Sequence, residues 1–135
     1  MNNLLIDTNV LIYAFDITSE FHRKSVEILE STQTNLFITT KNVSEFFSVC
    51  SKLDLDRDKT FGFFSDIKEN VTILKPTDKS LAVFEELVKK YKPRGNKVYD
   101  IEIVSIMLSN EIVKVVTANI DDFKNIEEIE VIKIN

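Results

Sequence analysis

The chain has 135 residues, of which 44% are hydrophobic and 29% are charged, and its formal net charge is −5. These values are typical of a single globular domain over residues 1–135, and they argue against a broad non-specific nucleic-acid surface, which usually requires a basic face. We expect a cytoplasmic protein without an internal disulfide. No apolar run reaches the roughly 18 residues of a membrane span, no signal peptide is recognisable, and Cys50 is the only cysteine.

Short apolar runs rich in β-branched residues alternate along the chain with longer segments of helical spacing. We predict strands at 3–6, 36–39, 71–74, 113–116 and 131–134. The segments with helical spacing are 19–31, 42–53, 57–68, 78–91 and 100–110. This alternation predicts a three-layer α/β fold, in which a central, mostly parallel sheet of four to five short strands is flanked by helices on both faces.

Acidic residues stand at the strand ends and helix starts that such a fold brings to one edge of its sheet. Asp7 ends the first apolar run, Glu45 lies near the start of the helix after the second predicted strand, and Asp100 opens the most apolar predicted helix. Asp121 and Asp122 follow the fourth predicted strand. Singly, each acid has an ordinary explanation as an N-cap or as a first-turn acid that answers the helix dipole. Together they lie where parallel α/β sheets bind their ligands.

The convergence of these acids predicts a bound cation. Carboxylates that meet in one cleft repel one another, and some of them take up protons unless a cation is present. A bound divalent ion reverses this penalty. Because the candidate ligands all offer oxygen, and because one histidine and one cysteine do not support a zinc site, the sequence favours Mg²⁺ or Mn²⁺.

Four segments carry the acids in a fixed order and spacing. They are "IDTNVLIYA" (6–14), "TTKNVSEFFSVCSKL" (39–53), "YDIEIVSIMLSNEI" (99–112) and "VVTANIDDF" (115–123). Over nearly the whole chain the sequence resembles the PIN-domain nucleases, and most closely the VapC-type toxins of toxin–antitoxin pairs. The first segment is similar to the opening strand and first acid of that family, the next two to the helices with its second and third acids, and the last to its closing motif.

The resemblance implies a single PIN domain that acts as a metal-dependent endoribonuclease and leaves 5′-phosphate and 3′-hydroxyl ends on RNA. It also implies three partners, namely the RNA substrate, a small DNA-binding antitoxin and a second copy of the chain in a homodimer. The residues implied for catalysis are Asp7, Glu45, Asp100 and Asp122, and those implied for the metal are Asp7, Asp100, Asn119 and Asp122. Around these acids the resemblance implies supporting roles for Thr8, Asn9 and Thr117: the two threonines hydrogen-bond the carboxylates, and Asn9 stabilises the turn from strand to helix.

One position departs from the family pattern. The residue two after Thr117 is often Asp in the family and is Asn119 here, so it offers an oxygen without a charge. Asp122 then takes the fourth negative role, and we expect one tightly held metal rather than two. The sequence does not decide whether Asp121 also faces the metal.

A basic segment, "KKYKPRGNK" (89–97), precedes Asp100 and contains a proline and a glycine that are typical of a loop. We interpret Lys92, Arg94 and Lys97 as a phosphate-binding patch at the opening of the cleft. A solvated helix end explains the same residues equally well, because cations favour helix C-termini.

Other classes of magnesium-dependent α/β protein fit less well. A phospho-acceptor receiver domain needs an acceptor Asp at the end of its middle strand, where this chain reads "TILKPTD" (72–78). A haloacid-dehalogenase-like phosphatase needs a second Asp two residues after the first, where Asn9 stands. Two alternatives within the resemblance stay open: a PIN nuclease of RNA processing outside any toxin–antitoxin pair, and a catalytically silent PIN fold that only binds.

Overall fold

The computed structural model describes residues 2–134, and its elements follow the predicted alternation of strands and helices. The strands are β1 (Asn2–Ile6), β2 (Thr34–Thr39), β3 (Val71–Leu74), β4 (Lys114–Thr117) and β5 (Glu130–Lys133). The helices are α1 (Thr8–Phe15), α2 (His22–Glu30), α3 (Thr40–Lys52), α4 (Arg57–Asn70), α5 (Asp78–Tyr91), α6 (Lys97–Ser109) and the short 3₁₀ helix η1 (Ile120–Asp122). Within the described range, no helix is both long enough and apolar enough to cross a membrane.

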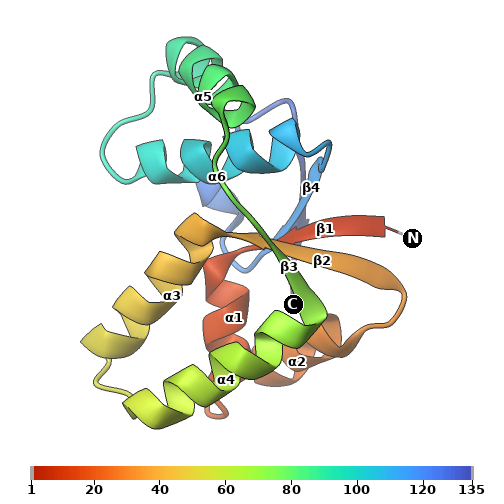
Figure 1. The fold of residues 1–135 in the computed structure, drawn as a ribbon, viewed down its shortest axis with the longest axis vertical. Helices are drawn as coiled ribbons and strands as arrows, with labels where there is room; N and C mark the ends of the chain where they lie inside the picture. The colour runs from red at the N-terminus through yellow and green to blue at the C-terminus, as the bar shows by residue number, and fades with distance from the viewer. Residues whose placement is uncertain (1, 135) are drawn as a thin grey trace.

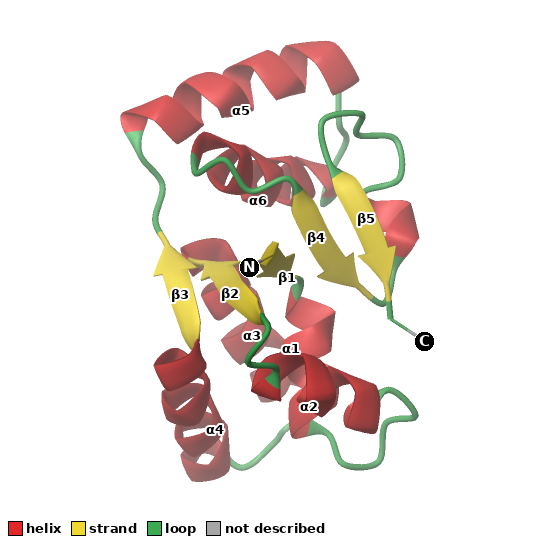
Figure 2. Ribbon diagram, turned by 90° about the vertical axis from the view of Figure 1, so that its right-hand side faces the viewer, coloured by secondary structure: helices red, strands yellow, loops and turns green. Residues whose placement is uncertain are grey.

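The five strands form one parallel sheet in the order β3-β2-β1-β4-β5 (Figure 1 labels the first four strands of the chain, and Figure 2 labels all five). This confirms the predicted α/β fold class with its parallel central sheet. β1 lies at the centre and pairs with β2 on one side and with β4 on the other, so the carboxyl ends of these three strands are neighbours. This edge is where a parallel α/β protein is expected to place its ligand.

Helices cover both faces of the sheet, and successive strand residues alternate between two cores. Ile6 and Val116 face the core that is built with α1 to α4, whereas Leu5 and Val115 face the core that is built with α5 and α6. Figure 2 shows these two groups of helices on opposite sides of the strands. All four side chains are at most 2% exposed, so the central strands are firmly held where they lead to the carboxyl edge.

Two helices start directly at this edge. α1 follows Asp7, which is its N-cap. α3 begins with a capping box, in which the side chains of Thr39 and Asn42 accept hydrogen bonds from each other's backbone N–H groups. Because β1 and β2 run almost without a loop into α1 and α3, residues at the start of both helices lie at the carboxyl edge of the sheet.

α6 begins earlier than the sequence predicts. The expectation that Asp100 opens this helix is wrong by three residues, because the first helical residue is Lys97. Gly95 adopts a φ of +57°, which glycine tolerates without strain. The backbone N–H groups of Lys97 and Val98 then donate to the carbonyl groups of Arg94 and Gly95 and wind the chain into the helix. Asp100 therefore lies one turn inside α6 and is not its cap.

Candidate active site

Asp7 is a buried carboxylate at the carboxyl edge of the sheet, with 6% of its surface exposed. Its Oδ1 accepts a hydrogen bond from the backbone N–H of Thr8 at 2.8 Å, and its Oδ2 accepts one from the Thr117 hydroxyl at 2.7 Å. Burial raises the pKa of Asp7 from 3.8 to about 6; the two hydrogen bonds offset part of this rise, and repulsion from Glu45 and Asp122 adds to it. One residue thus serves as helix cap and as a strongly perturbed acid.

The Thr117 hydroxyl, at the end of β4, is fixed by two donors. It accepts hydrogen bonds from the Asn9 side-chain amide at 3.2 Å and from the backbone N–H of Asn119 at 3.0 Å. The Asn9 side-chain oxygen accepts from the backbone N–H of Ala118 at 3.2 Å. Because both lone pairs of the Thr117 oxygen are occupied, its proton is directed to Asp7. Asn9 therefore joins α1 to the loop after β4 and sets the direction of the bond to the acid.

Glu45 lies on α3 and is linked to Asp7 through Thr8. The Thr8 hydroxyl donates to Glu45 Oε2 at 3.3 Å and accepts from the Asn42 side-chain amide at 3.0 Å. The second carboxylate oxygen, Oε1, is buried and has no hydrogen-bond partner among the described residues. Burial raises the pKa of Glu45, although the charge of Lys41 and the bond from Thr8 act in the opposite direction.

Asp100 approaches the same acids from α6, which contacts α3. Burial, together with repulsion from the three other acids, raises the pKa of Asp100 from 3.8 to about 7. The positive charge of Lys97, one turn earlier on the helix, opposes part of this rise. The structure therefore brings four predicted acids into electrostatic reach of one another, and we call Asp7, Glu45, Asp100 and Asp122 the acid cluster.

The residues that follow β4 take different positions. Asp122 is partly buried, and its Oδ1 lies 3.7 Å from Lys97 Nζ, which also donates to the backbone carbonyl of Asp121 at 2.8 Å. The Asp121 side chain is exposed and pairs with Lys124 at 3.2 Å. Asn119 is exposed, and its Oδ1 accepts from the Asp121 N–H at 3.3 Å, so this oxygen caps η1. Of the predicted residues in this segment, the structure joins Asp122 to the cluster and holds Asn119 and Asp121 in local contacts.

A cleft of about 400 Å³ lies between α3 and α6 beside the acid cluster. The residues that line it are Glu45, Ser48, Val49, Lys52, Asn96, Tyr99, Asp100 and Asp122. The Lys41 ammonium lies 3.9 Å from the centre of the Tyr99 ring, in cation–π contact. We call Lys41, Lys52 and Tyr99 the basic mouth of this α3–α6 cleft. The predicted phosphate-binding residues Lys92, Arg94 and Lys97 are exposed, and none of the three lines it.

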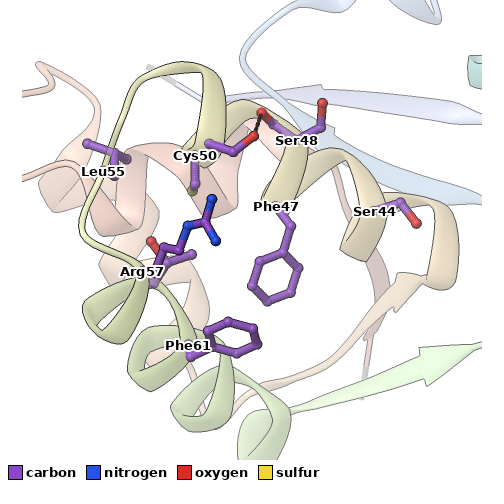
Figure 3. A pocket seen from close by; sticks show the side chains of 9 residues that line it. Ser44, Phe47, Ser48, Cys50, Leu55, Arg57 and Phe61 are labelled. Carbon is purple, nitrogen blue, oxygen red and sulfur yellow. Dashed lines mark hydrogen bonds between the residues drawn. The ribbon is translucent and has the colours of Figure 1, made fainter.

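A second cavity, of about 440 Å³, lies between α3 and α4 (Figure 3). Phe47 and Phe61 pack against each other beside it, with ring centres 5.0 Å apart. Figure 3 shows the Arg57 guanidinium extending between Cys50 and these two rings. None of its lining residues carries a carboxylate or an imidazole, so this cavity offers no ligands for a hard metal ion. We therefore place the candidate active site in the α3–α6 cleft.

The donor set fits a hard divalent cation in its chemistry. Every member of the acid cluster offers carboxylate oxygens, which Mg²⁺ and Mn²⁺ prefer, and Oε1 of Glu45 is a buried oxygen without a partner. Within residues 2–134, no three Asp, Glu, His or Cys side chains lie close enough together to hold a metal ion as they stand.

Four residues of the site are missing from the sequence prediction, namely Lys41, Asn42, Lys52 and Tyr99, and sequence signals point to the first three of them. Asn42 stands at the third position of the capping box after β2, a spacing visible in "TTKN". Lys41, Glu45, Ser48 and Lys52 follow one another at helical spacing. This polar stripe places the two lysines on the same face of α3 as the acid.

Comparisons with known proteins agree with the fold. The family model described as PIN domain matches residues 4–129. A chain of VapBC2 from Rickettsia felis, bound to a DNA fragment from its promoter, is similar with a TM-score of 0.76 and 19% identity over 98% of this chain and 99% of that chain. DNA-bound VapBC from Salmonella typhimurium gives a TM-score of 0.73 and 21% identity over 98% of each chain. VapC20 from Mycobacterium tuberculosis, described as a sarcin–ricin loop cleaving toxin, gives 0.66 and 12% identity over 83% of this chain and 86% of that chain. None of the curated proteins matches in sequence.

Proposed function

Since this chain belongs to the PIN domain family, whose model matches most of its length, we propose that it is a metal-dependent endoribonuclease and the toxin of a toxin–antitoxin pair. Its reaction is the hydrolysis of a phosphodiester bond in RNA. The observation that carries this proposal is the acid cluster at the carboxyl edge of the sheet, where burial and mutual repulsion raise the pKa of three of its members. Glu45 and Asp100 line the α3–α6 cleft and Asp7 is buried beside it, and strongly perturbed acids grouped at a cleft are typical of catalytic sites.

We assign Mg²⁺ or Mn²⁺ as the cofactor, with Asp7 and Asp100 as its direct ligands and Asp122 beside them. When bound, the ion lowers the pKa of its water and neutralises charge on the phosphoryl oxygens. Asp7 and Asp100 are suited to this role because they are the two acids whose pKa rises furthest, mainly through burial, so a cation offsets the largest cost of a charged carboxylate there. The Asn119 oxygen is already used to cap η1, which supports one metal rather than two.

Glu45 is the residue that we propose to orient the attacking water or to accept its proton. Its Oε2 is held by the Thr8 hydroxyl, while its buried Oε1 has no partner among the described residues and is free to accept a hydrogen bond. Its raised pKa makes it a better proton acceptor than an ordinary glutamate. Thr8 and Thr117 keep Glu45 and Asp7 in place during this step.

Local positive charge offers a path for RNA into an otherwise acidic protein. The basic mouth places Lys41 and Lys52 beside the acid cluster, and Tyr99 is 47% exposed and presents a ring on which a base can stack. The loop before α6 adds further exposed cations. The residues that we propose to contact RNA are Lys41, Lys52, Lys92, Arg94, Lys97 and Tyr99.

The structural neighbours support the toxin assignment. The Rickettsia and Salmonella chains belong to VapBC assemblies bound to DNA, and the Mycobacterium relative is described as a toxin that cleaves the sarcin–ricin loop. We therefore propose a small DNA-binding antitoxin as a partner, and a second copy of the chain in a homodimer. A silent binding module is the second candidate, which the neutral Asn119 favours.

Cleavage of a panel of structured RNAs in Mg²⁺, Mn²⁺ or EDTA tests the proposal. We expect the wild type to cut in either metal and not in EDTA, Asp7→Asn to cut at least about 100-fold more slowly, and Asp66→Asn, an exposed acid on α4, to match the wild type. RNA binding without cleavage would favour the silent module, and cleavage in EDTA would exclude the metal. Growth arrest on expression of the wild type, but not of Asp7→Asn, separates a toxin from a processing enzyme.

A further inference from the structure

Asn42 is a fully buried amide at the start of α3 that forms hydrogen bonds in two directions. Its Oδ1 accepts from the backbone N–H and from the hydroxyl of Thr39, both at 2.8 Å. Its Nδ2 donates to the hydroxyl oxygen of Thr8 at 3.0 Å. A backbone N–H can only donate, so the amide atom that faces it must be the oxygen, and the amide nitrogen must face Thr8.

This orientation decides where the proton of Thr8 points. An amide nitrogen only donates, so the Thr8 oxygen acts as the acceptor towards Asn42 and its single proton is left for another group. Glu45 Oε2 lies 3.3 Å away and receives it. Thr8 is only 5% exposed, so water competes little for this proton. The result is a relay from Asn42 through Thr8 to Glu45, which fixes one oxygen of the acid and leaves Oε1 free.

We propose that Asn42 is a positioning residue of the active site, which acts through Thr8 to hold the Glu45 carboxylate. Asn42 does not line the α3–α6 cleft, so it acts without touching substrate. The inference deepens the proposed function and rests on it for the role of Glu45. Because Glu45 is proposed to orient the water that the metal holds, loss of its positioning residue is expected to weaken metal binding, as removal of hydrogen-bond partners around a metal site commonly does.

A second relay of the same composition leads to the other buried acid. Asn9 donates to the Thr117 hydroxyl at 3.2 Å, which donates to Asp7 Oδ2 at 2.7 Å. In both relays an asparagine amide occupies the threonine oxygen and so turns the hydroxyl proton towards a carboxylate. Because the same arrangement occurs on two different helices, we infer that both asparagine amides serve to orient an acid.

The competing explanation is that Asn42 serves only as a helix cap. The chain contains a second capping box away from the cleft, in which Ser80 accepts from the backbone N–H of Thr77 at 2.8 Å and starts α5. Serine is therefore sufficient for the capping role in this protein. What Asn42 adds to the same motif is one donor, Nδ2, and that donor is directed to Thr8.

Four single variants separate these roles. Asn42→Ser keeps an oxygen for the cap and removes the donor, whereas Thr8→Val removes the hydroxyl and Thr8→Ser restores it. Ser80→Ala weakens the remote cap and serves as the structural control. Two readouts are used: the affinity for Mn²⁺ by calorimetry, and the ¹³C resonance of the Glu45 side-chain carboxyl in the metal-free protein by NMR.

We expect Asn42→Ser to weaken Mn²⁺ binding about tenfold or more, Thr8→Val to weaken it at least as much, and Thr8→Ser to stay within about twofold of the wild type. Because the relay is serial, Asn42→Ser should add no further loss in a Thr8→Val background. Both Asn42→Ser and Thr8→Val should shift the Glu45 resonance. Ser80→Ala should lower the urea midpoint and leave both readouts unchanged.

Wild-type Mn²⁺ affinity and an unshifted Glu45 resonance in Asn42→Ser would overturn the proposal, and so would losses that add fully in the double variant. If the wild type takes up no Mn²⁺ at millimolar concentration, the proposed metal dependence fails. The Glu45 resonance in the metal-free protein then decides the relay by itself, because that measurement requires no metal.

Discussion

Replacing Asp7 by asparagine should make the metal-free protein more stable relative to the wild type as the pH rises, although it removes a residue of the proposed active site. An acid whose pKa is higher in the folded than in the unfolded chain binds more protons when folded, so its contribution to stability is lost as the pH rises through the folded pKa. For Asp7 the rise from 3.8 to about 6 corresponds to about 3 kcal/mol. Asparagine does not titrate, so the unfolding free energy of Asp7→Asn relative to the wild type should increase by about 2 kcal/mol between pH 4 and pH 8, the rest of the change falling below pH 4.

Hydrogen bonding adds an offset that does not depend on pH. The asparagine oxygen can still accept from the Thr8 N–H, but its amide group faces the Thr117 oxygen, which already accepts two hydrogen bonds. This mismatch costs about 1–3 kcal/mol at every pH. The test is therefore how the difference in unfolding free energy between variant and wild type changes with pH. The size of that difference at a single pH is less informative.

Urea unfolding at pH 4, 6 and 8 in EDTA measures this change, with Asp66→Asn, an exposed acid on α4, as the matched control. A difference between Asp7→Asn and the wild type that stays constant over this range would refute the argument that burial of the Asp7 charge opposes folding. Magnesium at 100 times its Kd should then stabilise the wild type by about 2.7 kcal/mol and the variant by much less, which shifts the difference between them at pH 8 back in favour of the wild type.

The structure also predicts the effects of substitutions in the core, at an ion pair and at the basic mouth. Phe46 is 1% exposed, so Phe46→Ala should lower the free energy of unfolding by about 3–5 kcal/mol. Phe61 is 59% exposed, so Phe61→Ala should lower it by about 1 kcal/mol or less. Equal losses for the two variants in urea unfolding would contradict this reasoning. Lys97→Met breaks a partly exposed ion pair of 3.7 Å and should cost at most about 1 kcal/mol in the same assay. Lys52→Gln should reduce the slope of log RNA affinity against log salt by about one in filter binding, and Lys24→Gln, on α2, should leave it unchanged.

Each predicted run overlaps an observed strand, and the inner strands were predictable because burial on both faces selects short apolar runs. The sequence falls short where pairing alone extends a strand. β2 begins at Thr34 rather than at residue 36, and its polar start is held by the pairing of Asn35 with Asn3, whose side chains share a hydrogen bond of 2.9 Å. Such an extension depends on a partner strand and has no local signal.

The acids at helix starts were identifiable because one edge of a parallel sheet collects both caps and ligands. The individual contacts of the polar residues in "TANIDDF" could not be predicted, because several neighbouring polar residues can each cap the same turn. In the structure Asn119 takes the cap, Asp121 pairs with Lys124, and Asp122 turns towards Lys97 of α6. The choice depends on a lysine 24 residues away from Asp121 in sequence, which spacing within the motif does not reveal.

The stability of the fold alone does not explain which side chains stand at the carboxyl edge of the sheet. Asp7 is almost fully enclosed although its charge is penalised there, and Oε1 of Glu45 is a carboxylate oxygen left without a partner. The other buried side-chain atoms without partners in the described range belong to the neutral hydroxyls of Ser25 and Thr34, which cost less to bury than a charge. The unfavourable burial of two carboxylates thus occurs at one edge of the sheet, where two asparagine–threonine pairs orient them by hydrogen bonds. Such an arrangement is expected where a bound cation offsets the cost of burying the charges.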